Sequence, residues 1–186
     1  MISEKMKGYV ENGSAIRAMF EEGKKMADRF GAENVYDFSL GNPAAPVPEE
    51  VKKSIYDILE NRNANFVHCY MPNAGYPEVR EKVAANLNKK YNSSFTKDDI
   101  IMTVGAAGGI NCVLRSLLEP EDEVLCFAPF FGEYNSYVMN FGGNLKVVPA
   151  DYETFQLNVE EADKYITERT KAVIINNPNN PSGVVY

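Results

Sequence analysis

The sequence is poor in the residues that form disulfides, metal sites and hydrolytic triads. Its 186 residues include one histidine, His68, and three cysteines, Cys69, Cys112 and Cys126. The cysteines are odd in number and show no C-x-x-C spacing, which favours a reduced intracellular protein over a disulfide scaffold. No cluster of histidine, cysteine and acidic residues has metal-ligand spacing, so we expect no metal site. No serine or cysteine stands in a sequence motif typical of a nucleophile that would pair with the lone histidine, which argues against a catalytic triad.

Basic residues are also in deficit, because 19 lysines and arginines face 26 acidic residues for a formal net charge of −7. A nucleic-acid groove needs a clustered basic face, so we expect no nucleic-acid partner. No apolar run approaches the length of a membrane span, and charged residues interrupt the first twenty residues, unlike a secretory signal. We therefore expect a cytoplasmic protein without a membrane partner.

Hydrophobic residues make up 45% of the chain, as in an ordinary globular protein with one sizeable core. From about residue 98, short apolar runs alternate with helical stretches, which is typical of βαβ units and a sheet buried on both faces. The fold class is therefore α/β, with a mainly parallel sheet and flanking helices. Strands are expected near 100–104, 123–127, 145–148 and 172–176. Helices are expected near 14–30, 48–60, 76–91, 108–118 and 159–167, with a loose arm over 1–12, a short strand from Val35 and a loop over 64–76.

Ligands in such sheets bind beside the carboxyl ends of the strands. The first of these loops, VGAAGGI at 104–110, contains Gly105 for a tight turn and small residues that leave backbone N–H groups uncovered. At the start of a helix these groups favour a phosphate. The spacing is neither G-x-G-x-x-G nor a P-loop. Close packing of the helix on the sheet explains the small residues equally well, because strand–glycine–helix junctions are common in α/β folds.

Aromatic and amide side chains follow two other strands. Phe130 and Phe131 come after the second expected strand, where a ring can stack on a flat heterocycle or simply fill the core. The segment NNPNNPSG at 176–183 follows the fourth expected strand, and its prolines end the ladder. An asparagine held there can both donate to and accept from a ligand. A plain turn accounts for one Asn-Pro pair and less well for two.

Together these segments resemble the class I/II aminotransferases of the pyridoxal-phosphate fold type I superfamily. The matching segments, in order, are SLGNP, YMPNAGYPEVREKVA, VGAAGGI, APFFGEY and NNPNNPSG. Each is short, but their order and spacing over residues 39–183 are specific. The resemblance implies an amino-terminal portion of such an enzyme. Residues 1–47 would form an arm and a small-domain segment, and residues 48–186 the first part of the cofactor-binding large domain.

The cofactor that the resemblance implies is pyridoxal 5'-phosphate. The phosphate of the cofactor would be held by the segment after the first expected strand. The residues concerned are Gly105 and, through their main-chain amides, Ala106 and Ala107. Phe131 takes the place of the aromatic residue that stacks on the pyridine ring. Asn180 matches the asparagine that hydrogen-bonds the phenolic oxygen of the ring.

Substrate and subunit contacts are implied in the same way. Gly41, Phe131 and Asn180 match positions beside the substrate, with Gly41 and Asn180 near its carboxylate. Tyr70 matches the tyrosine that reaches the phosphate of the neighbouring subunit, which implies a homodimer.

The activity that the resemblance implies is amino transfer between an amino acid and a 2-oxo acid, in amino acid metabolism, with an aspartate-type substrate as one possibility. The same loops would serve a C–S β-lyase or a synthase on this fold, since they bind the shared cofactor. A non-catalytic module that binds a phosphate ligand is the third alternative.

One departure from the family concerns catalysis. The lysine that anchors the cofactor, the aspartate on the pyridine nitrogen and the carboxylate-binding arginine all follow the NNPSG loop in the family. We therefore expect no catalytic residue in this chain, and we expect a chain ending at Tyr186 to be incomplete and inactive alone. Two smaller departures are Phe131, where Tyr or Trp is more usual, and the lack of a Ser or Thr hydroxyl after Gly105.

Overall fold

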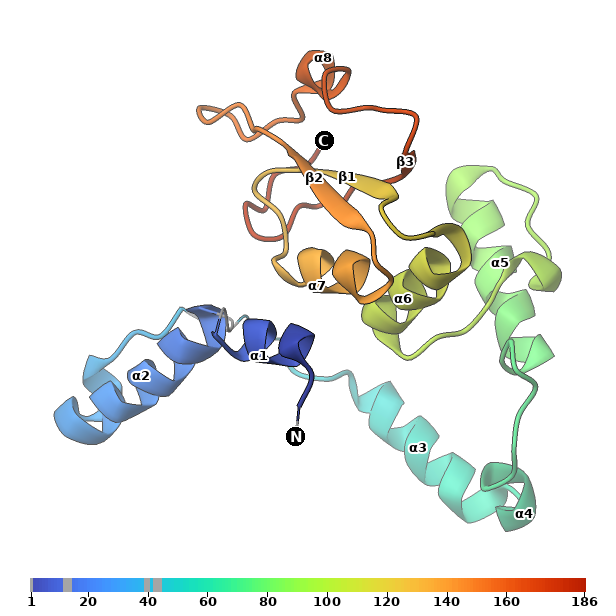
Figure 1. Cartoon of the computed structure of the whole chain (residues 1–186). Coiled ribbons are helices and arrows are strands. Elements are labelled where there is room, and N and C mark those ends of the chain that lie inside the picture. Colours follow the sequence, from blue (N-terminus) through green and yellow to red (C-terminus); the bar gives the residue numbers. More distant parts are fainter. Residues whose placement is uncertain (1, 12–14, 39–40, 42–44) are drawn as a thin grey trace. The chain divides into compact units, whose positions relative to one another are not determined.

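The structure is a computed structural model that describes residues 2–11, 15–38, 41 and 45–186. It divides into two compact units, Met1–Cys69 and Tyr70–Tyr186 (Figure 1). The first unit is helical in its described part. Its elements are α1 (Glu4–Glu11), α2 (Ala15–Phe30), the 3-10 turn η1 (Ala32–Asn34), α3 (Glu49–Asn61) and α4 (Ala64–Val67). None of the helices in the described ranges is long and apolar enough to cross a membrane.

Local signals explain where the helices of the first unit begin and end. Helix α2 ends at Phe30, and the next residue, Gly31, adopts a φ of 88° that favours glycine. The loose arm expected over residues 1–12 is wrong for Glu4–Glu11, which form α1. There the Ser3 hydroxyl accepts a hydrogen bond from the Met6 N–H at 3.2 Å, as an N-cap does.

Two further expectations in this unit are corrected. The stretch from Val35 to residue 38 pairs with no described strand and is not a strand itself. The loop expected over 64–76 begins with the short helix α4, because the Asn63 side chain accepts a hydrogen bond from the Asn65 N–H.

The second unit holds the sheet. Its elements are α5 (Pro77–Tyr91), the 3-10 turn η2 (Lys97–Asp99), α6 (Gly105–Leu117), β1 (Glu123–Phe127), α7 (Glu133–Asn140), β2 (Asn144–Val148), α8 (Val159–Ala162) and β3 (Thr170–Ile174). The strand order is β2-β1-β3, and β1 pairs in parallel with both neighbours. The α/β class and the parallel sheet are therefore confirmed.

Strand β1 is buried along its whole length, and its alternating side chains build two cores. Val124 packs with Leu114 and Leu118 of the α6 region and with Val138 of α7. On the other face, Leu125 and Phe127 pack with Val148 and Ala162. Figure 1 shows α6 and α7 on one side of the sheet and α8 on the other. Covering both faces is what a continuous apolar parallel strand requires.

The first expected strand, residues 100–104, is wrong. This run pairs with no described strand and bends at Val104, and Ile101 and Val104 are 71% and 95% exposed. Its Met102 N–H donates instead to the Ala74 carbonyl at 3.0 Å. A strand needs a neighbouring strand, and an apolar run in the sequence does not reveal whether one is present.

Three element boundaries also differ from expectation. Helix α6 begins at Gly105 and not near residue 108, so the small residues lie inside its first turns. Helix α8 ends at Ala162, after which turns replace the expected helix to residue 167. Strand β3 begins and ends two residues early, at Thr170 and Ile174. The division of the parent protein into domains at residues 47 and 48 stays a prediction.

Core packing on the α6 side of the sheet should dominate stability. Leu114 is 2% exposed against Val124 and Val138, so we expect Leu114→Ala to lower the free energy of unfolding by about 2–5 kcal/mol through lost burial and a cavity. Leu117 lies on the same helix at 47% exposure, and Leu117→Ala should cost about 0.5 kcal/mol or less. Urea unfolding of both variants measures the difference. Equal losses would contradict the packing described for this face.

Candidate functional site

The amino end of α6 carries unused hydrogen-bond donors. The N–H groups of Ala106 and Ala107 meet no acceptor among the described residues, and the N-cap Val104 offers none through its side chain. Gly105 to Ala107 are exposed and have no side chain larger than a methyl group. A 13-residue helix adds its dipole to these donors. The arrangement fits a phosphate group.

Close packing explains only some of the small residues in this segment. A Cβ on Gly109 would lie 3.2 Å from the Thr103 hydroxyl oxygen, so packing accounts for that glycine. A Cβ on Gly105 would meet nothing within 4 Å, yet Gly105 has a φ of 68°. The backbone conformation of the turn therefore requires this glycine. The Thr103 hydroxyl, which the sequence did not single out, donates to the Gly105 carbonyl at 3.0 Å and supports the turn.

The two phenylalanines after β1 have different surroundings. Phe130 lines a small cavity at the carboxyl end of the sheet, and Phe131 is not among the lining residues. Phe131 is half-buried and meets the Tyr134 ring edge to face, with centroids 5.7 Å apart and planes at 84°. Tyr134 is 8% exposed, and burial raises the pKa of its hydroxyl. Phe130 therefore borders the cavity, and Phe131 has its orientation fixed on one side by Tyr134.

The asparagines after β3 also differ from one another. Asn179 is 7% exposed and its side-chain amide donates to the Pro129 carbonyl at 3.2 Å. Asn180 is exposed, and its side chain forms no hydrogen bond with a described residue. The sequence pointed to Asn180 and missed Asn179. A Ser three residues after an Asn, as in Asn179–Ser182, is a turn signal that could have indicated the buried amide.

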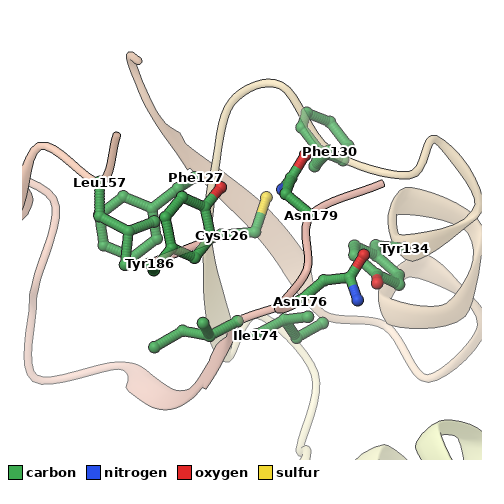
Figure 2. A pocket seen from close by; sticks show the side chains of 10 residues that line it. Cys126, Phe127, Phe130, Tyr134, Leu157, Ile174, Asn176, Asn179 and Tyr186 are labelled. Atoms are coloured by element: carbon green, nitrogen blue, oxygen red, sulfur yellow. The ribbon is translucent and has the colours of Figure 1, made fainter. Parts of the chain in front are cut away.

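A cavity of about 10 Å³ lies beneath this loop, the space that about one water molecule needs. Figure 2 shows Asn179 and Phe130 on one side of it, and the Tyr186 ring with Phe127 on the other. The Tyr186 hydroxyl is the buried side-chain polar atom left without a hydrogen-bond partner among the described residues. The cavity is too small for a cofactor, and neither Phe131 nor Asn180 lines it.

The remaining candidate residues are Tyr70 and Gly41, which belong to different compact units. Tyr70 is fully exposed, at 103%. Its loop is joined to the run before α6 by the hydrogen bond between the Met102 N–H and the Ala74 carbonyl. Gly41 is exposed, with nothing within 4 Å of an added Cβ, and the rest of the SLGNP segment lies outside the described residues.

The structure therefore joins some predicted residues and leaves others unconnected. The loops that carry Phe131 and Asn180 are linked through Pro129 and Asn179. No described hydrogen bond or ring contact joins the α6 amides to these two loops. No group of three or more histidine, cysteine, aspartate or glutamate side chains in the described ranges could hold a metal ion.

The comparisons with known proteins agree on one family. The sequence model of the family described as aminotransferase class I and II matches residues 32–186. A probable aspartate/prephenate aminotransferase from Aquifex aeolicus is 34% identical over 82% of this chain and 38% of its own length. An aspartate aminotransferase from Pyrococcus abyssi is 36% identical over 94% of this chain and 43% of its own length.

Solved structures agree with the sequence matches. The crystal structure of an aminotransferase from Eubacterium rectale superimposes with a TM-score of 0.93 at 39% identity, over all of this chain and 47% of its own. An aspartate aminotransferase from Thermotoga maritima gives a TM-score of 0.84 at 28% identity, over all of this chain and 48% of its own. The chain thus spans less than half the length of the relatives it matches.

Cysteine reactivity tests the packing around the cavity. Cys126 lines it at 1% exposure, and burial raises the pKa of its thiol to about 12. At pH 8 only about one thiol in ten thousand would be ionised at this site, whereas Cys69 and Cys112 are exposed. We expect an alkylating reagent to modify Cys69 and Cys112 in the folded protein and all three cysteines in urea, as read by mass spectrometry. Equal labelling of Cys126 in the folded protein would contradict the buried site.

Proposed function

Because the chain belongs to the aminotransferase class I and II family, we propose that it forms the amino-terminal part of a pyridoxal-phosphate-dependent aminotransferase. The family match over residues 32–186 carries this proposal, since those residues include every candidate site residue. The names of these relatives favour amino transfer over β-lyase or synthase chemistry. They also favour it over a non-catalytic phosphate-binding module.

The residues of the chain would each contribute binding or orientation. The main-chain amides of Ala106 and Ala107, in the turn set by Gly105, would bind the cofactor phosphate. Phe131 would stack on the ring face, and the free amide of Asn180 would donate to the phenolic oxygen and reach the substrate carboxylate. Bound pyridoxal phosphate supplies the electron withdrawal that loosens the bonds at the substrate Cα.

The proposal also covers the substrates of the full-length protein, its assembly from subunits and its location in the cell. Relatives named for aspartate, prephenate and aromatic amino acids support an amino acid and a 2-oxo acid as substrates, with aspartate-type specificity as one possibility. Gly41 would lie beside the substrate carboxylate. The exposed Tyr70 would reach the phosphate of a second subunit in a homodimer. A cytoplasmic location remains a prediction from composition.

Cofactor binding in the full-length protein tests the function and Asn180 together. Removing a donor to the ionised phenolic oxygen should weaken binding about 10-fold or more in Asn180→Ala. The matched control is Asn140→Ala, an exposed asparagine at the end of α7, which should leave affinity unchanged. Equilibrium dialysis measures both, and conversion of the bound cofactor to its amine form by an amino acid tests amino transfer. A full-length protein that binds no cofactor would contradict the proposed function.

The 186-residue chain by itself should behave differently. The resemblance places the anchoring lysine after the NNPSG loop, so the isolated chain should bind the cofactor weakly and catalyse no amino transfer. After borohydride reduction, peptide mapping should find only scattered, substoichiometric labels on surface lysines. A single stoichiometric adduct with measurable turnover would show that the residue assignments are wrong.

A further inference from the structure

Some side-chain amides of the NNPNNPSG segment form hydrogen bonds within the protein, and one does not. The Asn176 side-chain oxygen accepts from the Asn180 main-chain N–H at 2.7 Å. The Asn177 amide makes a pair of bonds with the main chain of Tyr186, accepting from its N–H at 3.1 Å and donating to its carbonyl at 3.4 Å. Only the Asn180 side chain stays exposed and unbonded among the described asparagines of this segment.

Asn179 has the fullest set of bonds. Its side-chain oxygen accepts from the Ser182 N–H at 3.1 Å and the Ser182 hydroxyl at 2.9 Å, while its amide nitrogen donates to the Pro129 carbonyl at 3.2 Å. Its main-chain N–H donates to the Val184 carbonyl at 2.9 Å, and its carbonyl accepts from the Gly183 N–H at 2.7 Å. With this amide buried and bonded at both ends, Asn179 is not itself available to a ligand.

The bond from Asn179 to Pro129 crosses between two loops that are 50 residues apart in sequence. Pro129 stands two residues before Phe131, and Asn179 stands one residue before Asn180. One buried amide therefore ties the loop bearing the candidate ring-stacking residue to the loop bearing the candidate oxygen-binding residue. A shift of either loop would change the distance between the face that Phe131 covers and the edge that Asn180 reaches.

We propose that Asn179 is a positioning residue that sets the placement of Asn180 relative to Phe131 in the cofactor site. This inference rests on the proposed function. Asn179 acts through Asn180: it holds the main chain so that the free amide of Asn180 meets the phenolic oxygen. Buried hydrogen bonds suit such a role because they define one loop geometry and are costly to leave unmade.

The test is Asn179→Asp in the full-length protein loaded with pyridoxal phosphate. The carboxylate keeps an acceptor for Ser182 but loses the donor to the Pro129 carbonyl, so the two loops separate. A donor to the ionised phenolic oxygen lowers the pKa of the bound cofactor. The pH midpoint of the cofactor absorption band should therefore rise by about one unit in Asn180→Ala and by about half a unit in Asn179→Asp.

The matched control is Asn177→Asp, which makes the same chemical change in the same loop. Asn177 bonds Tyr186 and has no bond to the loop after β1, so its midpoint should stay at the wild-type value. Asn179→Asp added to Asn180→Ala should cause no further shift, because the effect passes through Asn180. If Asn179→Asp does not fold, as judged by circular dichroism, Asn179→Ala removes the same donor without adding charge and should raise the midpoint similarly.

The outcomes separate the two proposals. If the wild-type full-length protein binds no pyridoxal phosphate, both the function and this inference fail. If it binds the cofactor and Asn180→Ala shifts the midpoint, but folded Asn179→Asp and Asn179→Ala do not, only the inference is overturned. An equal shift in Asn177→Asp, or an additive shift in the double variant, would likewise show that Asn179 has only a general stabilising role.

Discussion

The burial of strand β1 on every side is the constraint on which the sheet unit depends. Its main chain pairs with β2 along one edge and β3 along the other, while its side chains enter two separate cores. A strand held in this way cannot shift without breaking both ladders and exposing both cores. Its carboxyl end is therefore a fixed point, and the loops after β1 and β3 start from neighbouring positions at the same edge.

The candidate site is built from polar groups of two kinds at that fixed edge and at the start of α6. Buried amides such as Asn179 have their hydrogen-bonding capacity satisfied inside the protein, as buried polar groups generally do. The exposed amide of Asn180 and the first N–H groups of α6 retain theirs. The satisfied groups hold the loops, and the unsatisfied groups are free to bind. These unsatisfied groups match a ligand that has an anionic group at one end and a flat ring with a hydrogen-bond acceptor at the other.

Much of this arrangement could be predicted from the sequence, and the failures have physical causes. The strand at 123–127 was predicted with its observed bounds because a run buried on both faces has a distinct apolar pattern. The run at 100–104 has a similar apolar pattern, but such a pattern does not indicate whether a neighbouring strand is present. Asn180 was identified from the family motif. Asn179 was not identified, because its bond to Pro129, 50 residues away, forms only when the two loops are folded. Such a bond produces no periodic pattern in the sequence.

The two halves of the candidate site differ in how firmly the described residues hold them. The proposed ring-binding half, with Phe131 and Asn180, is tied to the buried strand β1 through Pro129 and Asn179. The proposed phosphate-binding half follows residues 100–104, which carry exposed apolar side chains and a single main-chain bond to Ala74 in place of a strand ladder. Within the described residues, therefore, the loops that carry Phe131 and Asn180 are held to the sheet by a buried side chain, whereas no strand pairing holds the run that leads into the α6 amides.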